Sequence, residues 1–329
     1  MQVLVQLCEH DDPNVRANAV KLLYCLIEDG DEAIILEHVG QKFIETLLRI
    51  IQLSNVEEAT TCAMGIISNL PENPQITQWL LDAGALPVIS KFIPDNSKHN
   101  DPRKYHLVEN ATGAMRRFTA STNTEWQKSA AEAGIIPVLV QLLDFGTTVM
   151  KKCAAISLAR FSESSLELSR PIPKRKGFFC FSAPPETGCL IHGGICAVES
   201  SFCLVEADAV EPLVRVLQDP DPGTCEAALD ALLTLIDGIK LQNGSKVLAE
   251  ANAIPLIIGF LSSSSPRLQE KALNTLERIF RLQELKQKYG SSAQMPLVDL
   301  TLRGNSRMKS LSARILAHLN VLHDQSSYF

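Results

Sequence analysis

One three-residue spacing recurs seven times along this 329-residue chain: a small residue is followed four and seven positions later by large apolar residues. The small residues are Ala19, Ala63, Ala111, Ala154, Ala228, Ala272 and Ser312. Because each residue turns an α-helix by about 100°, steps of four and seven return to one side, so each stripe marks a buried helix face. Successive stripes begin 40 to 48 residues apart, except for one gap of 74. A helical pattern with such a period predicts an all-α solenoid of about seven repeats.

Repeats extend one continuous core, so we expect a single domain over residues 1–329. The approximate repeat boundaries are 1–30, 31–72, 73–121, 122–165, 202–238, 239–283 and 284–323, and the long gap predicts an inserted loop over approximately 166–201. The net charge of −6 lacks the basic excess of a general nucleic-acid binder, and we expect no nucleic-acid partner. We find no secretory leader and no apolar run of membrane-spanning length, so we expect a cytoplasmic protein with free thiols.

Short phrases divide each repeat into helices. Ala83-Gly84-Ala85-Leu86-Pro87 is echoed by Ala133-Gly134-Ile135-Ile136-Pro137 and by two variants that carry Asp208 or Asn252 in place of the glycine. Glycine, aspartate and asparagine tolerate the unusual backbone conformation that ends a helix, and proline is accepted in the first turn of the next helix. Asp-Pro or Ser-Pro pairs predict the start of a longer third helix. The pattern therefore predicts three helices per repeat. In the first repeat we expect the chain to begin within the second of these helices.

These features resemble armadillo repeats, and the short first helix with its glycine boundary favours them over two-helix HEAT repeats. Three phrases are more specific: residues 173–180 (PKRKGFFC), 188–196 (GCLIHGGIC) and 203–207 (CLVEA) resemble the armadillo region of plant U-box E3 ubiquitin ligases of the senescence-associated type. That resemblance implies a right-handed solenoid that recognises ubiquitination substrates. It also implies a peripheral position at the plasma membrane in senescence or defence. We find no U-box in this chain, so an E2 enzyme would be recruited only by a segment that the chain lacks.

A non-catalytic armadillo scaffold or adaptor without ligase coupling is the alternative, and a nuclear-import adaptor is less favoured. Import adaptors carry repeated asparagines and nearby tryptophans on their third helices, whereas here Asn69 is the one such asparagine and both tryptophans lie elsewhere. We find no phosphate-binding, zinc-protease or nucleophile-elbow motif, so we expect no catalytic residue and no cofactor. The His192-Gly193-Gly194 phrase is interpreted as a turn.

The position six residues after each small residue is expected to point into a groove lined by the third helices. In order, these residues are Cys25, Asn69, Arg117, Arg160, Thr234, Arg278 and His318. Arg117 and Arg160 belong to successive repeats, with Arg116, Lys151 and Lys152 nearby in sequence. Guanidinium groups bind carboxylates and phosphates in pairs of hydrogen bonds, so we predict that this groove binds an acidic or phosphorylated segment of a protein partner. Intramolecular pairing of the same arginines is an equal alternative.

The inserted loop carries a second candidate site. Its basic-aromatic segment comprises Lys174, Arg175, Lys176, Phe178, Phe179, Cys180 and Phe181. Basic residues beside aromatic ones suit an anionic membrane surface, whereas phenylalanines packed on the solenoid edge are the alternative. Cys180 is a candidate acylation site.

Four cysteines of this region lie around His192 and raise the question of a zinc site. Cys180, Cys189, Cys196 and Cys203 are 9, 7 and 7 residues apart, without the CxxC pairs typical of zinc knuckles. Steps of seven would place three of them on one side of a helix, so we interpret them as packing residues and expect no metal, although the glycine pair at 193–194 would interrupt such a helix.

Overall fold

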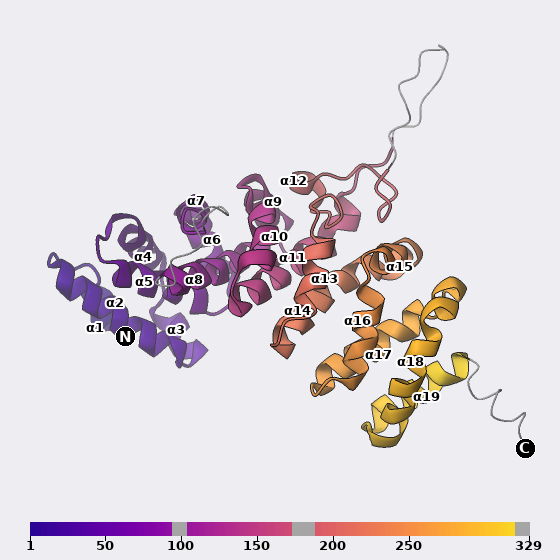
Figure 1. Cartoon of the computed structure of the whole chain (residues 1–329). Coiled ribbons are helices and arrows are strands. Elements are labelled where there is room, and N and C mark those ends of the chain that lie inside the picture. The colour runs from indigo at the N-terminus through magenta and orange to yellow at the C-terminus, as the bar shows by residue number, and fades with distance from the viewer. Residues whose placement is uncertain (94–103, 173–187, 320–329) are drawn as a thin grey trace, which may run out of the picture.

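A computed structural model describes residues 1–93, 104–172 and 188–319. These residues form an all-α solenoid, and the array runs from α1 at one end to α19 at the other (Figure 1). The first four units contain α1 (Gln2–Leu7), α2 (Pro13–Glu28), α3 (Glu32–His38), α4 (Gln41–Leu53), α5 (Glu57–Asn69), α6 (Pro74–Asp82), α7 (Ala85–Ser90), α8 (Tyr105–Met115) with the 3₁₀ turn η3 (Arg116–Thr119), α9 (Thr124–Glu132), α10 (Ile135–Phe145) and α11 (Thr148–Leu168). The later units contain α12 (Val198–Ser201), α13 (Val210–Val216), α14 (Pro222–Leu233), η4 (Thr234–Ile236), η5 (Gly238–Lys240), α15 (Leu241–Glu250), α16 (Ala253–Gly259), η6 (Phe260–Ser262), α17 (Pro266–Ile279), α18 (Gln283–Arg303) and α19 (Ser306–His318).

Local chemistry sets the helix boundaries as the phrases predict. Gly84, Gly134, Asp208 and Asn252 all have positive φ, between 53° and 76°, which ends one helix just before the next begins. Asp12, Asp221 and Ser265 accept hydrogen bonds from main-chain amides in the first turns of α2, α14 and α17, each of which has proline at its start.

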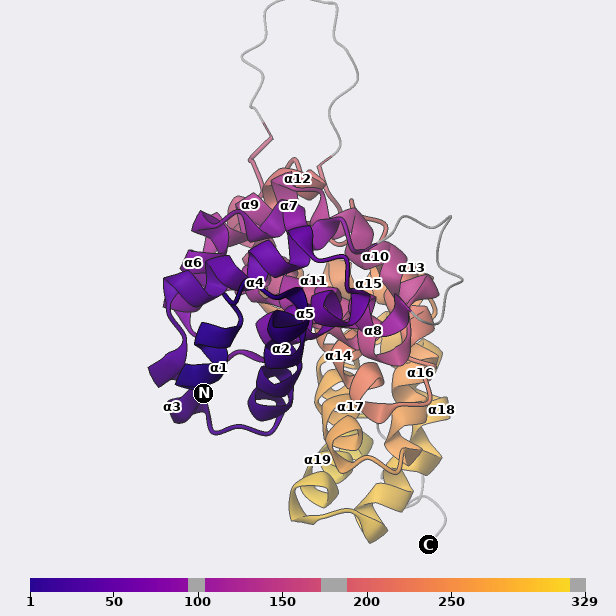
Figure 2. The same ribbon diagram turned by 90° about the vertical axis from the view of Figure 1, so that its left-hand side faces the viewer.

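The third helices form the spine of the solenoid. The helix α2 packs on α5, α5 on α8, α8 on α11, α11 on α14, α14 on α17 and α17 on α19. Figure 2 views this array from the α1 end. Since α11 and α14 are in direct contact, the insertion between them leaves the stack unbroken. The helix α11 continues to Leu168, so the insertion begins about three residues later than the expected 166.

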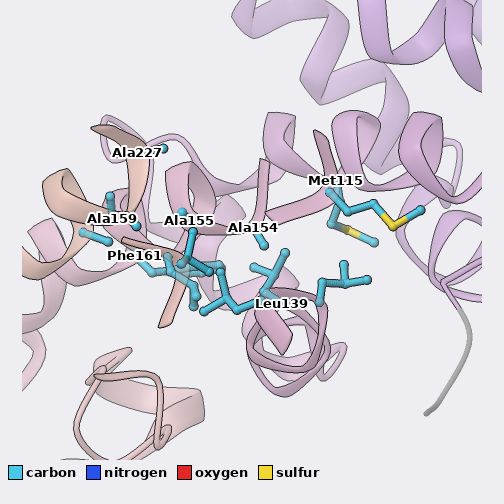
Figure 3. Packing of buried hydrophobic residues seen from close by; sticks show 14 of the residues in the cluster. Met115, Leu139, Ala154, Ala155, Ala159, Phe161 and Ala227 are labelled. Atoms are coloured by element: carbon cyan, nitrogen blue, oxygen red, sulfur yellow. The ribbon is translucent and has the colours of Figure 1, made fainter. Parts of the chain in front are cut away.

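The stripes supply the centre of this core. Six of the seven small residues are fully buried and the seventh, Ala19, is 2% exposed. Figure 3 shows Ala154, Ala155 and Phe161 of α11 packed with Leu139 of α10. The expectation for Leu26 is wrong, because its side chain is 49% exposed. The helices α1 and α5 pack on other sides of α2, so the side that carries Leu26 faces solvent.

The last repeat departs from the three-helix plan. The helix α18 runs without a break from Gln283 to Arg303, through Pro296. The corresponding phrase here is Ser292-Ala293-Gln294-Met295-Pro296, and it has no glycine, aspartate or asparagine to take up positive φ. The first and second helices of this repeat therefore merge, and the unit contains two helices in place of three.

No single helix in the described ranges is both long and apolar enough to cross a membrane. The one apolar pair of sufficient combined length, Gly238–Glu250 with Ala253–Ser262, is bent by 89°. Its second member buries Ala253, Ile254 and Ile257 in the solenoid core.

Phe161 provides a test of the core. It is fully buried on α11, and its ring meets that of Phe202 edge to face with centroids 5.1 Å apart. We expect Phe161→Ala to lower the free energy of unfolding by about 3–5 kcal/mol, measured by urea denaturation, because it leaves a cavity. Phe145→Ala is the matched control, since Phe145 on the neighbouring helix α10 is 62% exposed. Equal effects of the two changes would contradict this account.

Candidate functional site

The exposed surface of α2, α5, α8, α11, α14, α17 and α19 is called the third-helix face below. The sequence placed seven residues on it, one from each repeat. The structure shows that most of them reach back to the preceding repeat rather than outward. Their partners are main-chain carbonyls at the end of the preceding third helix, the groups that a helix cannot satisfy internally.

Arg117 is the most deeply buried of these residues, at 5% exposure. Its Nε donates to the carbonyl of Ile67 at 2.7 Å, and its Nη1 donates to the carbonyl of Pro71 at 3.0 Å. Burial lowers its pKa to about 10, so the guanidinium stays charged at neutral pH. The prediction that Arg117 is offered to a partner in an open groove is therefore corrected: its charge caps the carboxyl end of α5.

The same contact recurs along the stack. Arg160 Nη1 donates to the carbonyl of Arg116 at 3.3 Å, and Arg278 Nη2 donates to that of Ile236 at 2.5 Å. His318 Nε2 lies 2.9 Å from the carbonyl of Phe280. Four of the seven position-six side chains, those of Arg117, Arg160, Arg278 and His318, thus contact carbonyls at the end of the third helix of the repeat before.

The other three position-six residues differ. The hydroxyls of Thr234 and Ser162 lie 2.6 Å apart, which joins α11 to η4. Cys25 and Asn69 are exposed.

Three arginines and one carboxylate form a compact group, the Arg cluster, made of Arg116, Arg117, Arg160 and Glu72. Arg160 Nη2 donates to both carboxylate oxygens of Glu72, at 3.1 and 3.2 Å, and Arg116 Nη2 lies 3.5 Å from one of them. Burial tends to raise the pKa of Glu72, but the arginines outweigh it and hold that pKa below its usual value. Among the described residues, the buried Arg116 Nε has no hydrogen-bond partner.

Because the Arg cluster holds three guanidinium groups and one carboxylate, two positive charges lack an acidic counterpart within it. The side chains of Arg116 and Arg160 are 32% and 25% exposed, so solvent and a partner can reach them. Sequence reasoning missed Glu72, which lies 88 residues from Arg160.

The remaining basic candidates of the groove are each paired. Lys151 Nζ lies 3.6 Å from a carboxylate oxygen of Asp219, and Arg278 Nη2 lies 3.1 Å from one of Asp237. A hollow of about 480 Å³ opens beside Arg278, between α11, α14 with η4, and α17. Its charged lining is balanced, with three basic and three acidic residues: Arg160, Lys240, Arg278, Glu163, Asp230 and Asp237.

The basic-aromatic segment lies outside the described residues. This applies to Lys174, Arg175, Lys176, Phe178, Phe179, Cys180 and Phe181. The described residues on either side of it meet, because a Cβ added to Gly188 would lie 2.8 Å from Ile172 Cδ1.

The cysteines of the insertion form the one cluster of metal-ligating side chains found within the described ranges. One ligand atom each from Cys189, His192, Cys196 and Cys203 lies within 4.8 Å of all the others. A hydrogen bond from Cys203 lowers the pKa of the Cys189 thiol, against the effect of burial, and His192 adds to the lowering. The expectation of one helical side is wrong, since residues 188–197 form turns.

Comparison with known families identifies repeats of two related kinds. The armadillo/β-catenin-like repeat model matches residues 199–236, and the HEAT repeat model matches residues 1–30. Together with the helix order, these matches show that the chain is an all-α solenoid of armadillo repeats.

Similar proteins extend over nearly the whole chain. U-box domain-containing protein 24 of Oryza sativa subsp. japonica is 30% identical, and U-box domain-containing protein 44 of Arabidopsis thaliana is 28% identical. Both alignments cover 99% of this chain but 43% of the relative, so the chain spans less than half the length of these relatives.

Solved structures with the same fold include designed armadillo repeat proteins. One of these, YIII(Dq)4CqI, matches with a TM-score of 0.60 at 23% identity over 84% of this chain and 99% of its own. Another, a designed armadillo repeat protein in complex with peptide (KR)4, matches with a TM-score of 0.60 at 22% identity over 84% of this chain and 98% of its own.

Arg117 tests the capping role of position six. We expect Arg117→Ala to lower the free energy of unfolding by about 3 kcal/mol, because two buried carbonyls lose a charged donor. Arg117→Lys should recover part of this loss, since it restores one donor. Urea denaturation followed by circular dichroism measures the effect, with Arg281→Ala, a change at an exposed arginine just after α17, as control. A stable Arg117→Ala protein would show that these bonds are dispensable.

Proposed function

We propose that this chain, an armadillo-repeat solenoid, is a protein-interaction scaffold whose third-helix face binds an acidic or phosphorylated segment of a protein partner. We further propose that it acts as the substrate-recognition part of a U-box type ubiquitin ligase. The similarity of 99% of the chain to U-box domain-containing proteins supports the second step.

The Arg cluster carries the first step. The guanidinium groups of Arg116 and Arg160 both approach the same carboxylate oxygen of Glu72, at 3.5 and 3.1 Å. A carboxylate or phosphate of a partner can share or replace that arrangement, because charged hydrogen bonds to guanidinium are strong and paired. The groove hypothesis therefore rests on Arg116 and Arg160. Arg117 belongs to the same cluster, but it is buried and bonded to main-chain carbonyls.

The charge of this surface favours an acidic partner over a basic one. The designed armadillo repeat protein named above was solved with the peptide (KR)4, a basic ligand. The Arg cluster repels such a peptide. Farther along, the hollow beside Arg278 has balanced charge and can take neighbouring polar residues of the same segment.

A scaffold without ligase coupling is the second candidate for this surface. The two functions differ in what happens after capture, since a ligase transfers ubiquitin to the captured partner. Ubiquitination reactions with the full-length natural protein, E1 and E2 distinguish them. In a ligase, charge reversal at the Arg cluster removes transfer to the partner and leaves autoubiquitination intact.

Localisation is part of the same proposal. We place the protein in the cytoplasm, at the inner surface of the plasma membrane, with the basic-aromatic segment against anionic lipid. Each basic residue near such a surface contributes about 1 kcal/mol, and aromatic rings insert at the interface. The closeness of Ile172 to Gly188 supports this proposal, because it brings together the described residues on either side of the basic-aromatic segment.

Binding of a fluorescein-labelled octaglutamate peptide tests the Arg cluster. We expect Arg116→Glu combined with Arg160→Glu to weaken binding at least tenfold in fluorescence anisotropy, because attraction becomes repulsion. Glu72→Gln should strengthen binding, since it removes the internal competitor for the two arginines. Arg303→Glu is the control: it makes the same substitution at one position outside the Arg cluster, on α18, where Arg303 pairs with Asp299. Unchanged peptide affinity in the double variant would reject the proposal.

The membrane contact has its own test. We expect the chain to sediment with vesicles that contain phosphatidylserine. Replacement of Lys174, Arg175 and Lys176 by alanine should abolish this, because about 3 kcal/mol of attraction is lost. Vesicles of phosphatidylcholine alone serve as control. Equal sedimentation of the variant and the natural sequence would rule out this segment as the membrane contact.

A further inference from the structure

Three cysteines and one histidine of the insertion converge on a single point, and we propose that they form a structural zinc site. The ligands are Cys189 Sγ, His192 Nδ1, Cys196 Sγ and Cys203 Sγ. Three thiolates and one imidazole are a donor set typical of closed zinc sites, and soft thiolates favour zinc over magnesium or calcium. Four protein ligands leave no open position, so the site holds structure and performs no chemistry.

Three of the distances between the ligand atoms lie within about 0.4 Å of those in a tetrahedron around zinc. With zinc bonds of about 2.3 Å to sulfur and 2.0 Å to nitrogen, two sulfurs lie about 3.8 Å apart and a sulfur and a nitrogen about 3.5 Å apart. Cys189 Sγ and Cys203 Sγ are 3.7 Å apart. His192 Nδ1 lies 3.5 Å from Cys189 Sγ and 3.1 Å from Cys196 Sγ.

The surroundings orient the ligands as metal sites require. His192 Nε2 lies 3.0 Å from the hydroxyl oxygen of Ser165, a fully buried residue of α11. A partner at that nitrogen fixes the ring and leaves Nδ1 free to bind a metal ion. Cys196 Sγ lies 3.4 Å from Ser169 Oγ, which can donate to a thiolate.

The local backbone is shaped to deliver the ligands. Cys189 N donates to the carbonyl of Gly194 at 2.6 Å and Gly193 N donates to that of Cys189 at 2.8 Å, which closes a tight turn around His192. Gly193 has φ of +63°, and a Cβ on Gly194 would collide with the carbonyl oxygen of Arg170. The turn is joined to the residues just after α11 by main-chain bonds between Arg170 and Ile195.

The fourth ligand arrives from a separate turn. Phe202, just before Cys203, has φ of +53°, which costs a non-glycine residue energy and is typical of functional positions. Its ring packs edge to face on Phe161 of α11. The site therefore ties both ends of the insertion to one helix.

Ordinary thiol packing does not account for this arrangement. Packing would spread the side chains over apolar neighbours, whereas these ligand atoms all lie within 4.8 Å of one another and include a polar imidazole. A catalytic interpretation of Ser165 and His192 also fails, because Ser165 is fully buried.

Metal analysis of the chain of 329 residues tests the site. We expect protein purified under reducing conditions to hold about one zinc ion, measured by mass spectrometry. Replacement of zinc by Co²⁺ should give the visible absorption of a tetrahedral thiolate complex. Cys196→Ser and His192→Asn should each weaken Co²⁺ binding more than 100-fold, and Ser165→Ala should weaken it about 10–100-fold as an outer partner of the histidine.

Cys153→Ser is the matched control, because Cys153 is a half-buried thiol like Cys196 and lies away from the cluster. It should bind Co²⁺ like the natural sequence. Cys196 and His192 are only partly buried, so their variants are chosen over Cys203, and circular dichroism checks that they fold. Absence of a thiolate band with excess Co²⁺ overturns the proposal, as does zinc retained by both the Cys196→Ser and His192→Asn proteins.

Discussion

The close packing of consecutive third helices is the constraint on which the rest of the structure depends. It is possible because one small, buried residue per repeat lets neighbouring helices approach, as Ala154 of α11 and Ala228 of α14 show. That approach brings the carboxyl end of each third helix within reach of the next repeat. Arg117, Arg160, Arg278 and His318 use this proximity and lie within hydrogen-bond distance of main-chain carbonyls at that end. The same side chains therefore stabilise the stack and shape its surface.

Much of the fold could be predicted because local chemistry determines it. The stripes identify the buried faces, and the Asp-Pro and Ser-Pro pairs identify the helix starts. The structure differs from the prediction where the stripe or the repeat period does not determine the local structure. Leu26 has the stripe spacing, but no described helix covers that side of α2, so it is exposed. In α18 the absence of a residue suited to positive φ merges two helices, a signal that was present in Ser292–Pro296 but was outweighed by the repeat period.

The candidate sites were less predictable because they combine distant residues. Helical geometry placed Arg117 correctly on its helix, but the sequence could not show that carbonyls of the preceding repeat would surround it. Glu72 follows α5 and meets Arg160 of α11, so the two are joined by the stacking of three repeats and by no local pattern. For the cysteines a signal existed: Cys189 and His192 have the spacing of a CxxC pair with histidine in the second position. The spacings between the cysteines alone do not contain this signal, because they leave out the histidine.

The insertion shows how a repeat protein can gain a new element without losing its stack. The direct contact of α11 with α14 means that the insertion between them is accommodated without separating these two third helices. Such an insertion closes a long loop, and the entropy lost on closure rises slowly with its length. A fixed point close to the end of α11 removes most of the conformational freedom of the described part of the insertion. Three residues at or just after the end of α11 supply this fixed point. Ser165 contacts the imidazole of His192, Ser169 contacts the thiol of Cys196, and the main chain of Arg170 pairs with that of Ile195. The described ends of the insertion are thereby fixed beside the carboxyl end of α11, while the contact of α11 with α14 continues the stack.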